Sequence, residues 1–326
     1  MFINGENRLR AGWRLLFQFL LNNAGALLLG SLILAVFGGL SAGGAEPSSY
    51  LNVLPYAAAA LAAVASVWVS GRYLDRRSFS GFGLRLNRVW WSDLGFGLLL
   101  GASLMAGIFL VELTAGWVTV TGSFEPVGSG GFFPGILAPV ALFLCVGFYE
   151  ELVIRGYQLT NLAEGLNLPG IGPGGAVLLA WLLSSSFFGP LHAFNPNATL
   201  LTTLNISLAG MMLGLGYVLT GELAIPIGLH ITWNFFQSNV FGLPVSGLDP
   251  IGATFLITTQ NGPDLLTGGP FGPEGGLLAP VAMVLGLVLI SLRVRRRTGK
   301  LTLHTPIAES LTHHHQTTPH NDFRID

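Results

Sequence analysis

The chain has 326 residues, of which 51% are hydrophobic and only 10% are charged. Soluble domains usually carry about 25% charged residues, so this composition and a mean hydropathy of +0.63 indicate a membrane protein with several spans. A formal net charge of −1 excludes nucleic-acid binding as an overall property, and a single cysteine, Cys145, excludes both a disulfide framework and a multi-cysteine metal site.

Eight apolar runs are long enough to be transmembrane helices. The expected spans are about 15–40, 53–71, 94–120, 136–163, 176–195, 199–219, 223–241 and 277–292. The first run is longer than the apolar core of a signal peptide, so it is interpreted as a retained span. The predicted fold class is therefore an all-α polytopic membrane bundle.

The basic residues predict how this bundle is oriented. They gather in three blocks, at 8–14, 72–88 and 293–300, and between Arg88 and Arg293 the chain has one basic residue, Arg155. Lys and Arg concentrate in cytoplasmic segments beside membrane spans. We therefore expect both termini in the cytoplasm, in agreement with eight crossings, whereas the isolated Arg155 has no such topological explanation.

The segments between the spans divide the chain. The loops 41–52, 122–135 and 242–275 are expected on the external side, and Glu274 in the last of them is expected to be exposed. Residues 301–326 are polar and are expected to form a disordered tail. The predicted units are N-terminal helices at 1–125, a core at 126–245, a Gly/Pro-rich loop with the last helix at 246–300, and the tail.

The fourth span carries charges in an apolar setting. Glu150, Glu151 and Arg155 fall within six positions, although an ionisable group at membrane depth costs about 2.5–3.5 kcal/mol on insertion scales. Glu151 and Arg155 lie at i,i+4 on one helix face, and Glu150 points about 100° away. We expect a structural ion pair between Glu151 and Arg155, which leaves Glu150 for function.

Two later pairs also share helix faces at i,i+4 spacing, Phe188 with His192 and His230 with Asn234. Gly189-Pro190 is expected to kink the fifth span beside His192. If the helices converge, a carboxylate, two imidazoles and an amide surround one cavity. Such groups can activate a water and stabilise an oxyanion. They could equally hold a divalent metal such as zinc.

These residues resemble the CPBP family of intramembrane proteases, which includes the CAAX prenyl endopeptidases and bacterial abortive-infection and bacteriocin-processing proteins. The family pattern is E-E-x-x-x-R, then F-x-x-x-H, then H-x-x-x-N on successive helices. This chain has EELVIR at 150–155, FGPLH at 188–192 and HITWN at 230–234. The resemblance covers roughly residues 130–245 and implies an eight-helix bundle that hydrolyses peptide bonds at the membrane.

The resemblance also implies roles for the motif residues. Glu150 would be the water-activating base, assisted by His192, and His230 and Asn234 would stabilise the tetrahedral intermediate. In a metalloprotease, Glu150, His192 and His230 would instead be the candidate metal ligands. The supporting residues would be Glu151, Arg155 and Phe188.

The expected partners are membrane lipid and a membrane-associated peptide or protein substrate, and the expected location is a bacterial plasma membrane. Two other classes of function stay open at this point. One is a transporter that uses the buried Glu and His residues for binding or proton relay. The other is a catalytically silent immunity or scaffold protein. The intact motifs and the lack of an internal repeat favour the protease.

Overall fold

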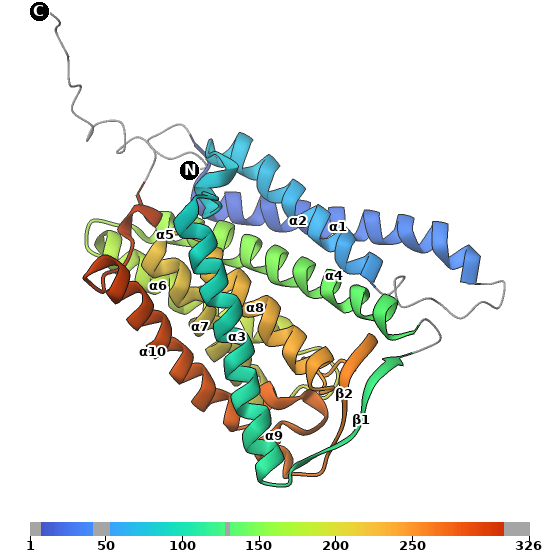
Figure 1. The fold of residues 1–326 in the computed structure, drawn as a ribbon. Helices are drawn as coiled ribbons and strands as arrows, with labels where there is room; N and C mark the ends of the chain where they lie inside the picture. Colours follow the sequence, from blue (N-terminus) through green and yellow to red (C-terminus); the bar gives the residue numbers. More distant parts are fainter. Residues whose placement is uncertain (1–7, 42–52, 128–130, 310–326) are drawn as a thin grey trace, which may run out of the picture.

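The computed structural model describes residues 8–41, 53–127 and 131–309, and it is a bundle of long helices with a small sheet at one end (Figure 1). Most of the predicted external loop 41–52, a few residues of the loop 122–135 and the tail from 310 onwards lie outside the described residues.

Seven described helices are long and apolar enough to cross a membrane, which confirms the prediction of an α-helical polytopic bundle. They include α1 (Ala11–Ser41), α2 (Leu54–Ser70) and α3 (Arg88–Thr114). The fourth begins with α4 (Phe132–Glu151) and continues through a π-helical segment (Leu152–Leu159) into α5 (Thr160–Leu166). The others contain α6 (Gly172–Phe188), α7 (Leu200–Thr220) and α10 (Leu278–Thr298).

The predicted seventh span, at 223–241, is shorter than expected. Its helix α8 (Ala224–Phe235) has 12 residues and is followed by a π-helical turn (Phe236–Val240), so it does not reach the length of the other spans. α8 is surrounded by protein, and it packs on α3 backbone to backbone. A Cβ at Gly97 would lie 2.4 Å from the carbonyl oxygen of Ile225, and one at Gly101 would lie 2.4 Å from that of Leu229. Small residues allow this close approach between membrane helices.

The long fourth span decides where the charged cluster lies. It covers Phe132–Leu166, 35 residues in all, so Glu150 and Glu151 lie near its middle rather than at either end. The winding changes from α to π immediately after Glu151. Local π-helical segments inside α-helices often occur at functional sites.

A two-stranded antiparallel sheet was not predicted. β1 (Val118–Val127) pairs with β2 (Gly252–Gln260), with an irregularity between Val120 and Gly122. β2 and most of β1 lie in segments predicted to be external loops, whereas the first residues of β1 were predicted to end the third span, which stops earlier, at Thr114. Between β2 and α10 the chain forms the short helix α9 (Asp264–Thr267) and two 3-10 turns, Gly269–Phe271 and Pro273–Gly275.

The fifth span ends where a kink was predicted. α6 stops at Phe188, and Pro190–His192 is a separate 3-10 turn. Gly189 between them lies against α7, where a Cβ would be 2.1 Å from the carbonyl oxygen of Thr203 and 2.2 Å from Oγ of Ser207. The close approach of two helices therefore requires glycine at this position, and the proline that follows has no backbone N–H to continue the helix.

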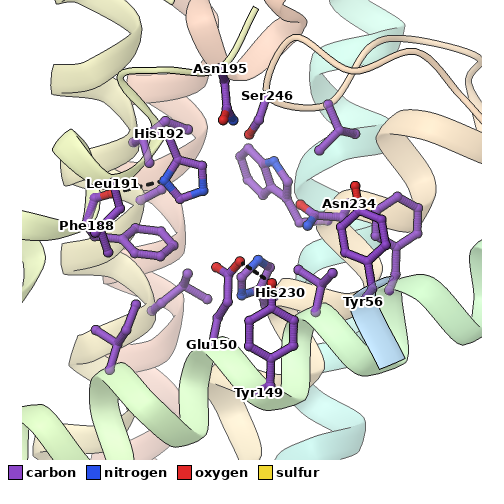
Figure 2. A pocket seen from close by; sticks show the side chains of 18 of the residues that line it. Tyr56, Tyr149, Glu150, Phe188, Leu191, His192, Asn195, His230, Asn234 and Ser246 are labelled. Carbon is purple, nitrogen blue, oxygen red and sulfur yellow. Dashed lines mark hydrogen bonds between the residues drawn. The ribbon is translucent and has the colours of Figure 1, made fainter. Parts of the chain in front are cut away.

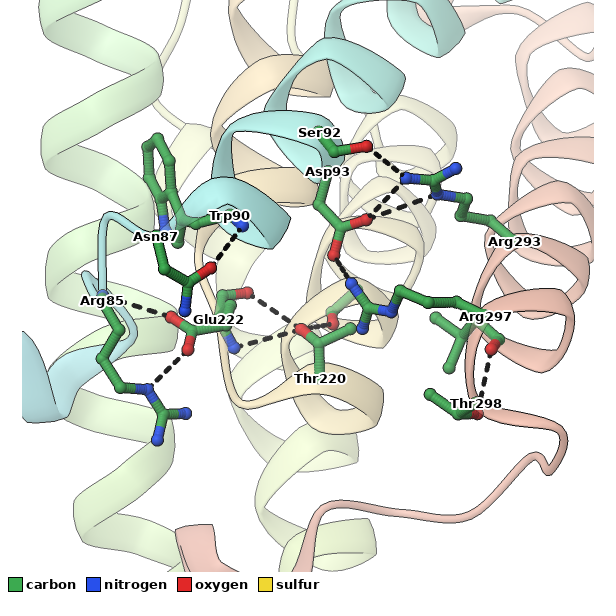
Figure 3. A network of polar contacts seen from close by, with 12 residues as sticks. Arg85, Asn87, Trp90, Ser92, Asp93, Thr220, Glu222, Arg293, Arg297 and Thr298 are labelled. Carbon is green, nitrogen blue, oxygen red and sulfur yellow. Dashed lines mark hydrogen bonds and ion pairs between the residues drawn. The ribbon is translucent and has the colours of Figure 1, made fainter.

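The basic blocks bind carboxylates at helix ends. Arg14 lies 2.6 Å from Asp75 and 2.8 Å from Glu164. In a second network, the buried carboxylate of Asp93 at the start of α3 binds Arg293 and Arg297 at the end of α10 (Figure 3). These buried pairs fix the relative positions of α1, α2, α3, α5 and α10.

The beginning of the predicted disordered tail is ordered. Residues Thr305–Ile307 form a 3-10 turn, and Ile307 and Ala308 are buried. The carbonyl oxygen of Ala308 accepts a hydrogen bond from the side chain of Asn167, three residues after Glu164. Apolar side chains within a polar segment thus pack against the bundle, which corrects the prediction for residues 301–309.

Candidate active site

A cavity of about 880 Å³ inside the bundle contains Glu150, His192, His230 and Asn234 (Figure 2). Its wall is built from α1, α2, α4, α6, α7 and α8, and from the turns around residues 190–195, 245–251 and 274. The three motifs, up to 84 positions apart between Glu150 and Asn234, therefore meet at one place, which is the convergence that the sequence analysis required.

The predicted ion pair between Glu151 and Arg155 is present, with Oε1 of Glu151 2.7 Å from Nη1 of Arg155. Both side chains are almost fully buried. The same oxygen also accepts a hydrogen bond from Nδ1 of His230 at 2.8 Å. Glu151 therefore joins the fourth span to α8, a connection that helix periodicity cannot reveal.

Phe188 separates Arg155 from the cavity. The guanidinium carbon of Arg155 lies 4.4 Å from the centre of the Phe188 ring, and such a cation over an aromatic face is attractive. Phe188 also contacts both imidazoles. The centre of its ring lies 4.9 Å from the ring centre of His192 and 6.4 Å from that of His230. Phe188 is 4% exposed and so fixes both histidines by packing.

The local contacts define the protonation pattern of the two imidazoles. Nδ1 of His192 lies 3.0 Å from the carbonyl oxygen of Phe188, and a carbonyl oxygen only accepts, so Nδ1 carries the proton. Nδ1 of His230 donates to Glu151. Nε2 of each histidine is therefore left for the cavity, where it accepts a hydrogen bond when the imidazole is neutral and donates one when both nitrogens are protonated.

Glu150 has no ionic partner among the described residues, and it lines the cavity. Its Oε1 lies 3.4 Å from the hydroxyl of Tyr149, and its Oε2 is buried with no hydrogen-bond partner among the described residues. Figure 2 shows the carboxylate pointing into the cavity, with His192 across the space from it. Asn234, one helical turn after His230, also faces this space. An acceptor, two imidazoles and an amide thus line one volume that can hold water and a peptide bond.

A family model described as type II CAAX prenyl endopeptidase Rce1-like matches residues 132–236. This segment, which we call the Rce1-like domain, is similar to that family. The match begins at the first residue of α4 and ends just after α8, and it contains all three motifs. It confirms the resemblance seen in the sequence and supports a CAAX-type membrane protease. No curated protein and no solved structure matches the chain.

The Rce1-like domain does not present the predicted metal site. The candidate ligands were Glu150, His192 and His230, but among the residues with described positions no three His, Cys, Asp or Glu side chains are grouped so that they could hold a metal ion. The contacts at Nδ1 of His230 and His192 leave Nε2 of each ring as the atom that could coordinate. Because the described residues show no such group of three ligands, the mechanism proposed here uses no metal ion.

Several residues of the cavity were missed by sequence reasoning. Tyr149, Asn195 and Ser246 line it, and Glu274, which was predicted to be exposed, is 4% exposed and also lines it. Glu274 lies outside the Rce1-like domain, in the glycine-rich sequence GGPFGPEGG. The signal that could have identified it is the density of glycines, which allows the backbone to fold inward at this point.

Proposed function

We propose that the chain is an intramembrane endopeptidase that hydrolyses peptide bonds of membrane-associated substrates with a water activated by Glu150 and His192. The observation that carries this proposal is one cavity lined by a carboxylate without an ion pair and by two imidazoles whose Nε2 atoms have no hydrogen-bond partner among the described residues. A buried carboxylate without an ion pair is costly at membrane depth. Glu112 of α3 is also buried without a partner among these residues, so the position of Glu150 beside the two imidazoles, rather than its burial alone, points to chemistry.

The first step is attack of water on the peptide carbonyl. Oε2 of Glu150 has no hydrogen bond from the described residues. It accepts one proton of the water while the water oxygen bonds to the carbonyl carbon. Nε2 of His192 accepts a hydrogen bond from the same water and orients it. General-base catalysis of this kind contributes about 10²- to 10⁴-fold to the rate.

The second step stabilises the negative oxygen that develops on the carbonyl. The carboxylate of Glu151 at 2.8 Å favours the protonated form of His230, which then has an Nε2–H to donate. The side-chain amide of Asn234 supplies a second donor from the same helix face. Donors fixed in advance at such a position lower the barrier because they need no reorganisation during the reaction.

The third step breaks the carbon–nitrogen bond. The proton held by Glu150 passes to the leaving nitrogen, so the products are a carboxylic acid and an amine and the carboxylate is restored. Glu151, Arg155 and Phe188 take no part in proton transfer in this proposal. They hold His230 and His192 in position through the contacts described above.

The test is hydrolysis of a membrane-tethered, quenched fluorescent peptide by the full chain purified into liposomes. Wild-type protein should cleave it, and Glu150→Ala should not, while both give the same melting temperature. The matched control is Glu125→Gln, which removes an exposed carboxylate of β1 that does not line the cavity. Full activity in Glu150→Gln would remove the proposed base.

The orientation in the membrane is part of the same proposal. Arg14 of the first basic block and Arg77 of the second share the carboxylate of Glu164. Arg293 of the third block binds Asp93 near the start of α3. Positive segments beside spans favour the cytoplasmic side. Both described chain ends meet at α5, through Glu164 and Asn167. We place this end of the bundle in the cytoplasm, and a reporter fused to either terminus tests it.

A further inference from the structure

The charges that line the cavity are of one sign. Among the described residues its carboxylates are Glu150, Asp249 and Glu274, and none of its lining residues is Lys or Arg. Of the fifteen Lys and Arg residues of the chain, only Arg324 lies outside the described residues. Apart from the two histidines, the part of the cavity that the structure describes therefore offers no cation to a bound substrate.

Arg155 does not fill this role, although it is close in sequence to Glu150. Its side chain is 1% exposed, and its nitrogens donate to Glu151 at 2.7 Å and to the carbonyl oxygen of Gly210 at 3.3 Å. The ring of Phe188 covers the guanidinium on the cavity side. A substrate carboxylate in the cavity would meet Glu150 and Glu274 without reaching this arginine.

Glu274 is held in place with one oxygen left over. Oε1 accepts hydrogen bonds from the backbone N–H of Ser246 and from its hydroxyl, at 2.7 Å for the hydroxyl. Oε2 receives no hydrogen bond from the described residues, although the side chain is only 4% exposed. The amide of Asn205 donates to the backbone carbonyl oxygens of Glu274 at 3.0 Å and of Gly276 at 2.9 Å, so the backbone is fixed as well.

The backbone around Glu274 is shaped to bring this carboxylate inward. Gly272 has φ 102, and a Cβ there would lie 2.0 Å from the carbonyl oxygen of Pro244. Only glycine fits a left-handed backbone conformation this close to another chain segment. The 3-10 turn Pro273–Gly275 follows directly. The segment thus directs the glutamate into the bundle, where an apolar side chain would cost less.

Glu274 is a buried carboxylate that forms no ion pair with Lys or Arg among the described residues. Burial raises its pKa, while the hydrogen bonds from Ser246 and the attraction of His192 and His230 oppose that change. Glu274 lines the same cavity as the two histidines. A positive group beside the scissile bond would compensate for the buried carboxylate, whereas a negative group would be repelled.

We propose that the substrate of this site is a peptide segment with a Lys or Arg side chain within about two residues of the scissile bond, with Glu274 as the residue that accepts its charge. Asp249, exposed at the edge of the cavity, attracts the same side chain during entry. A chain end with a free carboxylate close to the scissile bond is disfavoured. This inference rests on the proposed peptidase function and adds the class of substrate.

The test compares peptides that differ in one charge. The full chain in liposomes is given membrane-tethered fluorogenic peptides with Lys, norleucine or Glu beside the scissile bond. We expect kcat/KM to be at least about tenfold higher for Lys than for norleucine, which corresponds to about 1.4 kcal/mol, and to be lowest for Glu. A second pair of peptides ends three residues after the bond in a carboxylate or in an amide, and the amide should be cleaved faster.

The variant Glu274→Gln assigns the preference to one residue. Glutamine keeps an oxygen that can accept both hydrogen bonds from Ser246, so the turn stays fixed while the charge is removed. We expect the ratio of kcat/KM for Lys and norleucine peptides to fall to about one, mainly through KM of the Lys peptide. The matched control, Glu125→Gln, removes an exposed carboxylate outside the cavity and should leave the ratio unchanged.

The outcomes separate this inference from the peptidase proposal. Equal rates for the Lys and norleucine peptides in wild-type protein, with an inactive Glu150→Ala variant, overturn the inference and leave the peptidase intact. So does an unchanged preference in Glu274→Gln. If Glu150→Ala cleaves every peptide as wild type does, the peptidase mechanism itself fails, and the substrate class fails with it.

Discussion

Nδ1 of His230 donates a hydrogen bond to Oε1 of Glu151 at 2.8 Å, although the residues are 79 positions apart. The second glutamate of the E-E-x-x-x-R motif therefore does more than neutralise Arg155. It connects the middle of the fourth span to α8 and sets which nitrogen of His230 faces the cavity. The first glutamate, with no ionic partner, faces the cavity directly.

Glu151→Ala should reduce stability. Removing one partner of a buried ion pair leaves the other charge unpaired and costs about 3–5 kcal/mol. Here Arg155 and His230 lose the same oxygen. We expect lower yield and a lower melting temperature, measured by thermal unfolding in detergent.

The neighbouring variant Glu150→Ala is the control for that loss, because its carboxylate has no ion pair. It should keep the wild-type melting temperature. Normal expression and stability of Glu151→Ala would show that the buried pair contributes nothing to folding.

Glu150→Gln should lose activity without losing the fold. Glutamine fills the same volume but does not take a proton from water at neutral pH, so the expected decrease in kcat is about 10²- to 10⁴-fold. The measurement is single-turnover cleavage of the tethered peptide. An increase in KM alone, with kcat intact, would assign Glu150 to binding instead.

Asn234→Ala should lower kcat and leave KM nearly unchanged. The amide is proposed to bind only the oxygen that becomes negative in the transition state, and loss of one such donor typically costs about 10²- to 10³-fold. The cleavage rate at saturating peptide measures this effect. A variant that binds the peptide more weakly but turns over at the wild-type rate would contradict the role of Asn234.

Gly189→Ala should loosen the contact between α6 and α7. The new Cβ would lie 2.1 Å from the carbonyl oxygen of Thr203, and overpacking typically costs about 1–3 kcal/mol. Activity should decrease as well, because the displaced turn carries His192.

Gly174→Ala is the matched control for Gly189→Ala. It lies in the same helix, and a Cβ there meets nothing within 4 Å. Its melting temperature should equal or exceed that of the wild type, because alanine favours the helix more than glycine does. If both variants unfold alike, the close approach at Gly189 is not important for stability.

Chelation should leave peptide cleavage intact. No three candidate ligands are grouped in the part of the chain with described positions, so the proposed mechanism depends on Glu150, His192 and His230 alone. The measurement combines cleavage after dialysis against a strong chelator with metal analysis of the purified protein. Stoichiometric zinc that is lost together with activity would replace this mechanism by a metal-assisted one.

The sequence by itself determined the features that depend on composition or on spacing within one helix. Apolar runs of sufficient length predict spans because lipid provides no hydrogen-bond partners for the backbone. The i,i+4 spacing of Glu151 and Arg155 predicts their pair, which is present at 2.7 Å, whereas Phe188 and His192, predicted on one helix face, belong to α6 and to the separate 3-10 turn that follows it. The three motifs together predicted the family.

The tertiary structure alone decided which helix faces meet. Periodicity specifies the direction of a side chain around its own helix, but contacts between helices depend on how closely the backbones approach. Gly97 and Gly101 let α8 lie inside the bundle against α3, which places His230 beside Glu151 and makes the predicted seventh span short. Gly272 likewise brings Glu274 from a loop predicted to be exposed into the cavity, because only packing between distant segments determines how deeply a loop is buried.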